Sequence, residues 1–268
     1  MMAPRSASLV LPVYNGERYL ADTFGALLEF FAPRRPFDIV VVNDGSRDST
    51  AAIARQWAST HPQIRLLQHA SNRGKGAAVR TGVLASGGAL IGFCDVDLPV
   101  PVEHIEQLFR TLEEGAEIVI ASRALSQSVL VVPPSALRHL LSRSFNRIVR
   151  ALFALPFHDT QCGLKGFRQA AAREVFSRAL VDGFAFDVEL LLLARELGYE
   201  MVEMAARFDN PRQSSIRLEA HAATICRDLW RMHRRLRHMR GAGKRRKIVP
   251  DVEPEERAVI GTSMQRDG

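Results

Sequence analysis

Short apolar runs alternate with amphipathic stretches along the first half of the chain. The runs have the length of buried strands and cover residues 8–13, 37–42, 64–67, 89–93 and 118–121. Between them, apolar positions at helical spacing predict helices over 17–31, from a cap at Asp48 or Ser49 to about residue 59, from Ala77 onward, and over 102–112. Strands that alternate with helices predict an α/β fold, in which helices cover both faces of a mostly parallel sheet.

The second half mixes loops, helices and strands. Residues 124–134 have the composition of a loop, and residues 158–168 are expected to form a compact turn followed by a strand. Helices are predicted over about 135–155, near 170–180 and over 186–197, a strand over 201–207, and a polar, basic loop over 209–217.

The last predicted helix, from about Glu219 to Arg240, is amphipathic. Its apolar seam repeats at spacings of four and three, and arginines cover the other side; the seam consists of Ile225, Leu229, Met232, Leu236 and Met239. Such a helix suits a membrane surface or a membrane-embedded partner subunit, and a helix packed on its own domain has the same pattern. Beyond Gly241 the chain is expected to be disordered.

Composition and charge narrow the function classes. The chain is 47% hydrophobic and 24% charged, which indicates a globular protein, and no apolar run approaches the ~20 residues of a membrane span. Residues 216–247 hold 11 lysines and arginines against 2 acidic residues, whereas the rest holds 25 against 27. A slightly acidic body disfavours a nucleic-acid-binding module. Three widely spaced cysteines and a start without a long apolar run lead us to expect a cytoplasmic protein.

Polar motifs follow the predicted strands, where ligands of open α/β sheets bind. The clearest is Asp95-Val96-Asp97, directly after the run at 89–93. If the strand continued through this motif, the two carboxylates would share a face and repel each other unless a cation lay between them. Carboxylate oxygens suit Mg²⁺ or Mn²⁺. An acidic turn without a ligand is the alternative.

Taken together, the motifs resemble family 2 glycosyltransferases, which have the GT-A fold. The first-half motifs are Pro12-Val13-Tyr14-Asn15, Asn43-Asp44-Gly45-Ser46, Asn72-Arg73-Gly74-Lys75-Gly76, Asp95-Val96-Asp97 and Ser122-Arg123. Two later motifs, at 159–167 and 184–190, resemble the dolichyl-phosphate β-glucosyltransferase branch, near dolichol-phosphate mannose synthase. The resemblance implies a catalytic domain over 1–215, with a nucleotide-sugar half (1–123) and an acceptor half (124–215), then a basic helix (216–240) and a tail (241–268).

For the donor, the resemblance implies that Asp95 and Asp97 hold the metal beside the diphosphate of a nucleotide sugar. Pro99 stands where some relatives carry a further ligand, so fewer protein ligands are expected. The remaining donor-binding residues implied are Pro12, Tyr14, Glu17, Asp44, Lys75 and Asp187. Lys75 is equally compatible with a solvated surface lysine.

For the acceptor, the resemblance implies a polyprenyl phosphate at a membrane's cytoplasmic face. Its phosphate is a dianion near neutral pH, so it needs a cationic clamp rather than a strong base. The candidates for that clamp and its surroundings are Arg123, Arg143, Gln161, Arg212 and Arg217. Arg143 suits an ordinary exposed arginine as well, and Gln161 and Asp187 suit buried structural hydrogen bonding.

The reaction expected is inverting transfer of glucose from UDP-glucose, with Asp97, Arg123 and Asp159 as catalytic residues. A different family 2 activity, with GDP-mannose or another donor and a glycan hydroxyl as acceptor, would require a true base at Asp159 or nearby. A turn cap is a further possibility for Asp159, and Cys162 is interpreted as a packed residue rather than a nucleophile.

Overall fold

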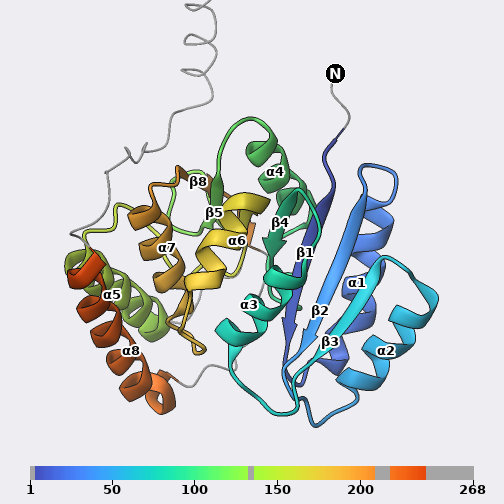
Figure 1. Ribbon diagram of the computed structural model, residues 1–268, viewed down its shortest axis with the longest axis horizontal. Helices are drawn as coiled ribbons and strands as arrows, with labels where there is room; N and C mark the ends of the chain where they lie inside the picture. Colours follow the sequence, from blue (N-terminus) through green and yellow to red (C-terminus); the bar gives the residue numbers. More distant parts are fainter. Residues whose placement is uncertain (1–3, 132–135, 209–217, 240–268) are drawn as a thin grey trace, which may run out of the picture.

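The computed structural model describes residues 4–131, 136–208 and 218–239, which form a sheet layered between helices (Figure 1). The seven-stranded sheet has the order β3-β2-β1-β4-β7-β5-β8. Its strands are β1 (Ala7–Val13), β2 (Phe37–Asn43), β3 (Ile64–Gln68), β4 (Leu90–Phe93), β5 (Ile118–Ser122), β7 (Lys165–Arg168) and β8 (Met201–Ala205). The α/β class is therefore confirmed.

Helices cover both faces of the sheet, because successive side chains of the apolar strands point to opposite faces. On β1, Val10 belongs to one hydrophobic cluster and Leu9 and Leu11 to the other. The helices are α1 (Glu17–Phe31), α2 (Thr50–Thr60), α3 (Lys75–Ala85), α4 (Val102–Glu113), α5 (Ala136–Phe153), α6 (Gln169–Arg178), α7 (Phe186–Leu197) and α8 (Leu218–Met239). The clusters place α1, α2 and α4 on one face and α3, α5, α6, α7 and α8 on the other.

Strand β7 is antiparallel to both of its neighbours, β4 and β5. The chain returns from α5 at the carboxyl ends of the parallel strands, so the strand that follows enters the sheet at that end and runs back. This insertion separates β4 from β5 and places the turn at residues 158–164 directly beside the polar ends of both strands.

One segment differs from the sequence prediction. Residues 124–134, predicted as a loop, contain a two-residue strand, β6 (Val129–Leu130), which pairs with β9 (Arg207–Phe208) in a second small sheet. A strand pair this short carries no periodicity that a sequence pattern can reveal. Strand β4 ends at Phe93, where the apolar run ends, so the strand does not continue through Asp95 and Asp97.

Helix α8 lies beside α5 and packs on the domain through part of its apolar seam (Figure 1). Leu229 is 7% exposed and Met232 is 4% exposed, and both belong to the cluster that contains Val149 and Phe153 of α5. The prediction that this seam faces a membrane is wrong for these two residues, since the domain already covers them. The predicted tail from 241 lies outside the described residues.

Candidate functional site

The turn after β2 is held by Asp44, whose carboxylate is buried and bonded within the protein. One oxygen, Oδ1, accepts from the backbone N–H of Arg73 at 2.9 Å and lies 2.6 Å from Nδ1 of His69. The other, Oδ2, accepts from the backbone N–H of Gly74 at 2.8 Å. Asp44 thus joins the end of β2 to the loop that leads into α3 and Lys75.

The turn after β1 is joined to the turn after β2 in the same way. Ser49 N–H donates to the Glu17 carboxylate at 2.8 Å, so Glu17 fixes the start of α2. Asn15 has a φ of 52° and accepts from Arg47 N–H at 2.9 Å. Pro12 is half-buried at the end of β1, whereas the Tyr14 ring is 47% exposed. The sequence predicts that the nucleotide binds here, where the exposed Tyr14 ring lies beside the two turns that these bonds hold in place.

Asp95 and Asp97 occupy a tight turn after β4. Leu98 N–H donates to the Asp95 carbonyl at 3.1 Å, and Leu98 has a φ of 43°. Both aspartates are half-buried. Asp95 Oδ1 lies 2.5 Å from Lys75 Nζ, an ion pair between the β4 turn and the start of α3. Lys75 is therefore no solvated surface lysine: it lies at the site, although against a carboxylate.

The carboxylates of Asp95 and Asp97 suit a hard divalent cation that is bound by few protein ligands. Within the described part of the chain, no three His, Cys, Asp or Glu side chains converge as a metal cage. Asp95, however, already attracts one cation, the Lys75 ammonium, and Asp97 follows two residues later in the same turn. Mg²⁺ and Mn²⁺ commonly take one or two carboxylates and complete their shell with substrate phosphates and water.

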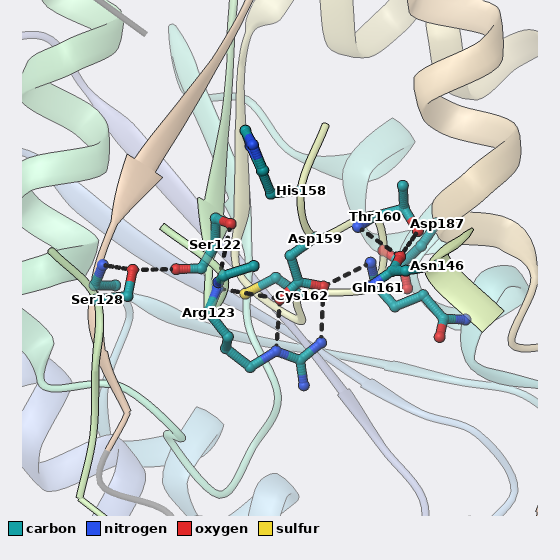
Figure 2. A network of polar contacts seen from close by, with 12 residues as sticks. Ser122, Arg123, Ser128, Asn146, His158, Asp159, Thr160, Gln161, Cys162 and Asp187 are labelled. Carbon is teal, nitrogen blue, oxygen red and sulfur yellow. Dashed lines mark hydrogen bonds and ion pairs between the residues drawn. The ribbon is translucent and has the colours of Figure 1, made fainter. Parts of the chain in front are cut away.

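Across the site, Arg123 and Asp159 form a bidentate ion pair (Figure 2). Arg123 Nε and Nη2 donate to the two carboxylate oxygens at 2.6 and 2.9 Å, and the Arg123 backbone N–H donates to Oδ2 at 3.1 Å. The Asp159 side chain is 3% exposed, whereas that of Arg123 is 39% exposed. Burial alone would raise the pKa of Asp159, but the Arg123 guanidinium holds that pKa below its usual range.

The turn that carries Asp159 is held from behind by β8 and α5. Backbone N–H groups of His158 and Asp159 donate to Glu203 of β8 at 2.9 and 3.1 Å. Thr160 Oγ1 donates to Asn146 of α5 at 2.7 Å. Gln161 N–H donates to Asp159 Oδ1 at 3.1 Å (Figure 2). These bonds fix the turn, and thereby the direction in which Asp159 presents its carboxylate to Arg123.

Beneath the turn lies a second, fully buried ion pair. Lys165 Nζ lies 2.6 Å from Asp187 Oδ1 and donates to the Cys162 carbonyl at 2.7 Å. Burial raises the pKa of Asp187 above its usual value, although Lys165 and Lys75 both oppose that shift. This pairing agrees with the alternative that Asp187 makes a buried structural contact, beneath the turn that carries Asp159.

The remaining predicted residues divide into three groups. Arg143 is exposed on α5, as an ordinary surface arginine would be. Arg212 and Arg217 lie outside the described residues. Cys162 is 1% exposed, and burial raises the pKa of its thiol to about 11, so it is a packed thiol rather than a nucleophile.

Four residues that hold the site were not predicted: His69, Asn146, Lys165 and Glu203. Each touches a predicted residue or the turn that carries one, from a position between 14 and 44 residues away. Of the four, Lys165 could have been noticed in the sequence, because it is a lysine among the apolar residues of a predicted strand. The other three have no local signal, because only the fold brings them to their partners.

Comparisons with known proteins identify the family to which the chain is similar. A family model, Glycosyl transferase family 2, matches residues 8–176. A dolichyl-phosphate beta-glucosyltransferase of Trichomonas vaginalis is 34% identical over 222 residues, which cover 79% of this chain and 66% of that relative. One of Dictyostelium discoideum is 31% identical over 250 residues, 88% of this chain and 76% of that relative.

Among solved structures, glucosyl-3-phosphoglycerate synthase from Mycobacterium tuberculosis, in complex with Mn²⁺, uridine diphosphate and phosphoglyceric acid, superposes with a TM-score of 0.62. It shares 18% identity, and the match covers 86% of this chain and 78% of that one. This likeness shows the fold alone, which is the GT-A arrangement. Because the family model matches more than half of the chain, the chain belongs to glycosyl transferase family 2.

Proposed function

We propose that this protein transfers glucose, with inversion, from UDP-glucose to a polyprenyl or dolichyl phosphate, with Mg²⁺ or Mn²⁺ as cofactor. One observation carries the proposal: the acidic turn after β4 and the Arg123–Asp159 pair after β5 meet at the single turn that precedes β7. A Cβ added to Gly163 of that turn would lie 2.4 Å from Asp95 Oδ2, so the turn that carries Asp159 lies directly against Asp95. The names of the similar proteins support glucose as the sugar and dolichyl phosphate as the acceptor.

On the donor side, Asp95 and Asp97 would hold the metal, which would neutralise the charge of the departing diphosphate. Lys75, whose ammonium is paired with Asp95, would supply a positive charge beside the donor phosphates. The exposed Tyr14 ring offers a face for the base. Asp44 already accepts two backbone N–H groups and contacts His69, so we assign it to holding the turn after β2 in place, with at most one lone pair directed at the nucleoside.

On the acceptor side, the Arg123–Asp159 pair favours a phosphate over a hydroxyl. A hydroxyl acceptor needs a base with a pKa near the working pH, whereas the pKa of Asp159 is lowered and its oxygens are bound to Arg123. A phosphate dianion needs no base. The two bonds to Asp159 use the Nε–Nη2 edge of the guanidinium, and the partly exposed side chain has further N–H donors for an acceptor oxygen.

The lipid part of the acceptor requires approach to a membrane surface. Among the described residues, no helix combines the length and apolarity that a membrane span needs. With Leu229 and Met232 of α8 buried, we assign membrane contact to its outer face, where Trp230 is 57% exposed and Arg234 lies over its ring at 4.8 Å. Exposed Ile148 and Arg147 of the neighbouring α5 would extend that contact. A membrane-embedded partner subunit could use the same face.

The test is a panel of acceptors and donors with purified protein. Radiolabelled UDP-glucose, UDP-galactose and GDP-mannose are each incubated with Mg²⁺ and either dolichyl phosphate, dolichol or a soluble glycan. The proposal predicts label in the organic phase only with UDP-glucose and dolichyl phosphate, released by mild acid as free glucose. Transfer to dolichol or to the glycan at an equal or higher rate would overturn the phosphate-acceptor assignment.

A further inference from the structure

Lys165 lies in the sheet between the two strands, β4 and β5, that lead to the two halves of the site. It is the first residue of β7, and it is paired in register with Phe93 of β4 on one side and Ile120 of β5 on the other. Two residues after Phe93 comes Asp95, and three residues after Ile120 comes Arg123. Lys165 therefore lies between the points from which the metal-binding carboxylates and the arginine leave the sheet.

Its side chain is fully buried, which is costly for a cation unless it is paired and hydrogen-bonded. The ammonium satisfies this condition with the Asp187 carboxylate at 2.6 Å and the Cys162 carbonyl at 2.7 Å, and it lies 5.7 Å from the centre of the Phe93 ring. These contacts join three segments distant in sequence: the end of β4, the turn before β7 and the first turn of α7.

The contact with Cys162 has a consequence for Asp95. The Cys162 carbonyl belongs to the peptide group that joins Cys162 to Gly163, so the bond from Lys165 holds that peptide in place. Gly163 lies so close to Asp95 that a Cβ there would be 2.4 Å from Oδ2. Two residues earlier, Gln161 N–H donates to Asp159, the partner of Arg123. Movement of this turn would displace the metal carboxylate and the arginine pair together.

We propose that the buried Lys165–Asp187 pair is a positioning device that sets the turn at 159–163 against Asp95 and so fixes the spacing between the metal-binding carboxylates and the acceptor clamp. The inference rests on the proposed function for the identity of those two halves. It assigns no substrate contact to either residue. It also revises the prediction for Asp187, from a nucleotide-sugar ligand to a support behind the site.

The rival account is that the pair only stabilises the fold. Replacing a buried ion pair by apolar or neutral groups of similar volume is often neutral for stability, whereas removing one partner leaves an uncompensated buried charge. The double variant Lys165→Met/Asp187→Asn removes both charges and keeps the volume, so it separates positioning from stability. Arg35→Met is the matched control, because Arg35 is also buried and bidentate to Glu106, but it lies before the amino end of β2, whereas the site lies at the carboxyl ends of the strands.

Three readouts are needed: the urea midpoint from circular dichroism, Mn²⁺ affinity in the presence of UDP from the EPR signal of free Mn²⁺, and kcat with a water-soluble short polyprenyl phosphate. We expect the double variant to unfold near the wild-type midpoint, to bind Mn²⁺ at least about tenfold more weakly, and to lose about a hundredfold in kcat. Arg35→Met should lower the urea midpoint and leave Mn²⁺ affinity unchanged. A sugar contact by Asp187 would not move Mn²⁺ affinity, because UDP carries no sugar beyond its ribose.

Wild-type Mn²⁺ affinity in the folded double variant would overturn the inference, and so would an equal loss of affinity in Arg35→Met. Failure of the double variant to fold would also overturn it, since Lys165 would then be a requirement of the fold itself. If the wild-type protein binds no Mn²⁺ with UDP, the proposed function fails first and the inference fails with it. Mn²⁺ and UDP binding without transfer to any polyprenyl phosphate would overturn the acceptor assignment alone.

Discussion

Helix α8 is either part of the core or a separable anchor, and single substitutions on its two faces decide between them. Leu229 and Met232 are 7% and 4% exposed, whereas Trp230, between them in sequence, is 57% exposed. Truncating a buried Leu or Met to Ala costs about 2–5 kcal/mol, since apolar contact is lost and a cavity remains. Truncation of an exposed side chain away from such contacts stays within about 0.5 kcal/mol.

We therefore expect Leu229→Ala and Met232→Ala each to lower the free energy of unfolding by about 2–5 kcal/mol. That is a large fraction of the total of about 5–15 kcal/mol for a native protein, so the double variant should be close to unfolded at 37 °C. Trp230→Ala should leave the free energy of unfolding almost unchanged while reducing sedimentation on anionic liposomes. Truncation of the chain before α8 should likewise destabilise the domain.

The assay is urea unfolding followed by circular dichroism, with all variants in the same buffer and the midpoint and slope fitted together. Equal, small effects of Leu229→Ala and Trp230→Ala would refute the packing argument. They would mean that α8 leaves the domain in solution and that its seam is available to a membrane after all.

Three further outcomes are expected. Gly163→Ala should weaken Mn²⁺ binding with UDP about tenfold or more, because its Cβ would displace the Asp95 carboxylate, whereas Gly87→Ala, with nothing within 4 Å, should bind normally. Asp159→Asn should lower the free energy of unfolding by about 1.5–3 kcal/mol at neutral pH. Because the folded-state pKa of Asp159 is depressed, its contribution is present above the unfolded value of about 3.9 and is lost as the pH falls through the lower, folded value. The two urea midpoints should therefore converge in acid below the unfolded pKa; a constant gap would contradict the ion pair. A thiol reagent near pH 8 should label the exposed Cys226 and spare Cys94 and Cys162, whose pKa values burial raises, until urea is added; rapid labelling of all three would refute their burial.

The elements of the fold could be predicted from the sequence because their signals are local. Five apolar runs became five parallel strands, and the helices at 17–31 and 186–197 have the predicted bounds. The direction of β7 was not predictable from residues 165–168 alone, since it depends on where α5 returns the chain to the sheet. For the same reason the strand pairs that put Lys165 between Phe93 and Ile120 have no sequence signature.

The candidate site was predictable as a set of residues but not as a set of contacts. Motifs after strands identified Asp95 and Arg123, because carboxyl ends of parallel strands meet at one edge. Asp159, in a turn before a strand, was identified through the family resemblance of the motif at 159–167. Whether Asp159 is a base or the partner of Arg123 depends on a contact between residues 36 positions apart. Likewise, the seam of α8 fits a membrane and a core equally well until the fold shows Val149 and Phe153 in the same cluster.

The central claim is that Asp95 and Asp97 bind a divalent cation for glucose transfer to a phosphate acceptor. The most direct test is the initial rate of transfer from UDP-glucose to a short, water-soluble polyprenyl phosphate, measured with Mg²⁺, after excess EDTA, and after Mn²⁺ is restored, in wild type and Asp97→Asn. The account predicts that EDTA abolishes transfer, that Mn²⁺ restores it, and that folded Asp97→Asn has lost most of it in every condition. Full transfer in excess EDTA, or a wild-type rate in Asp97→Asn, would contradict it.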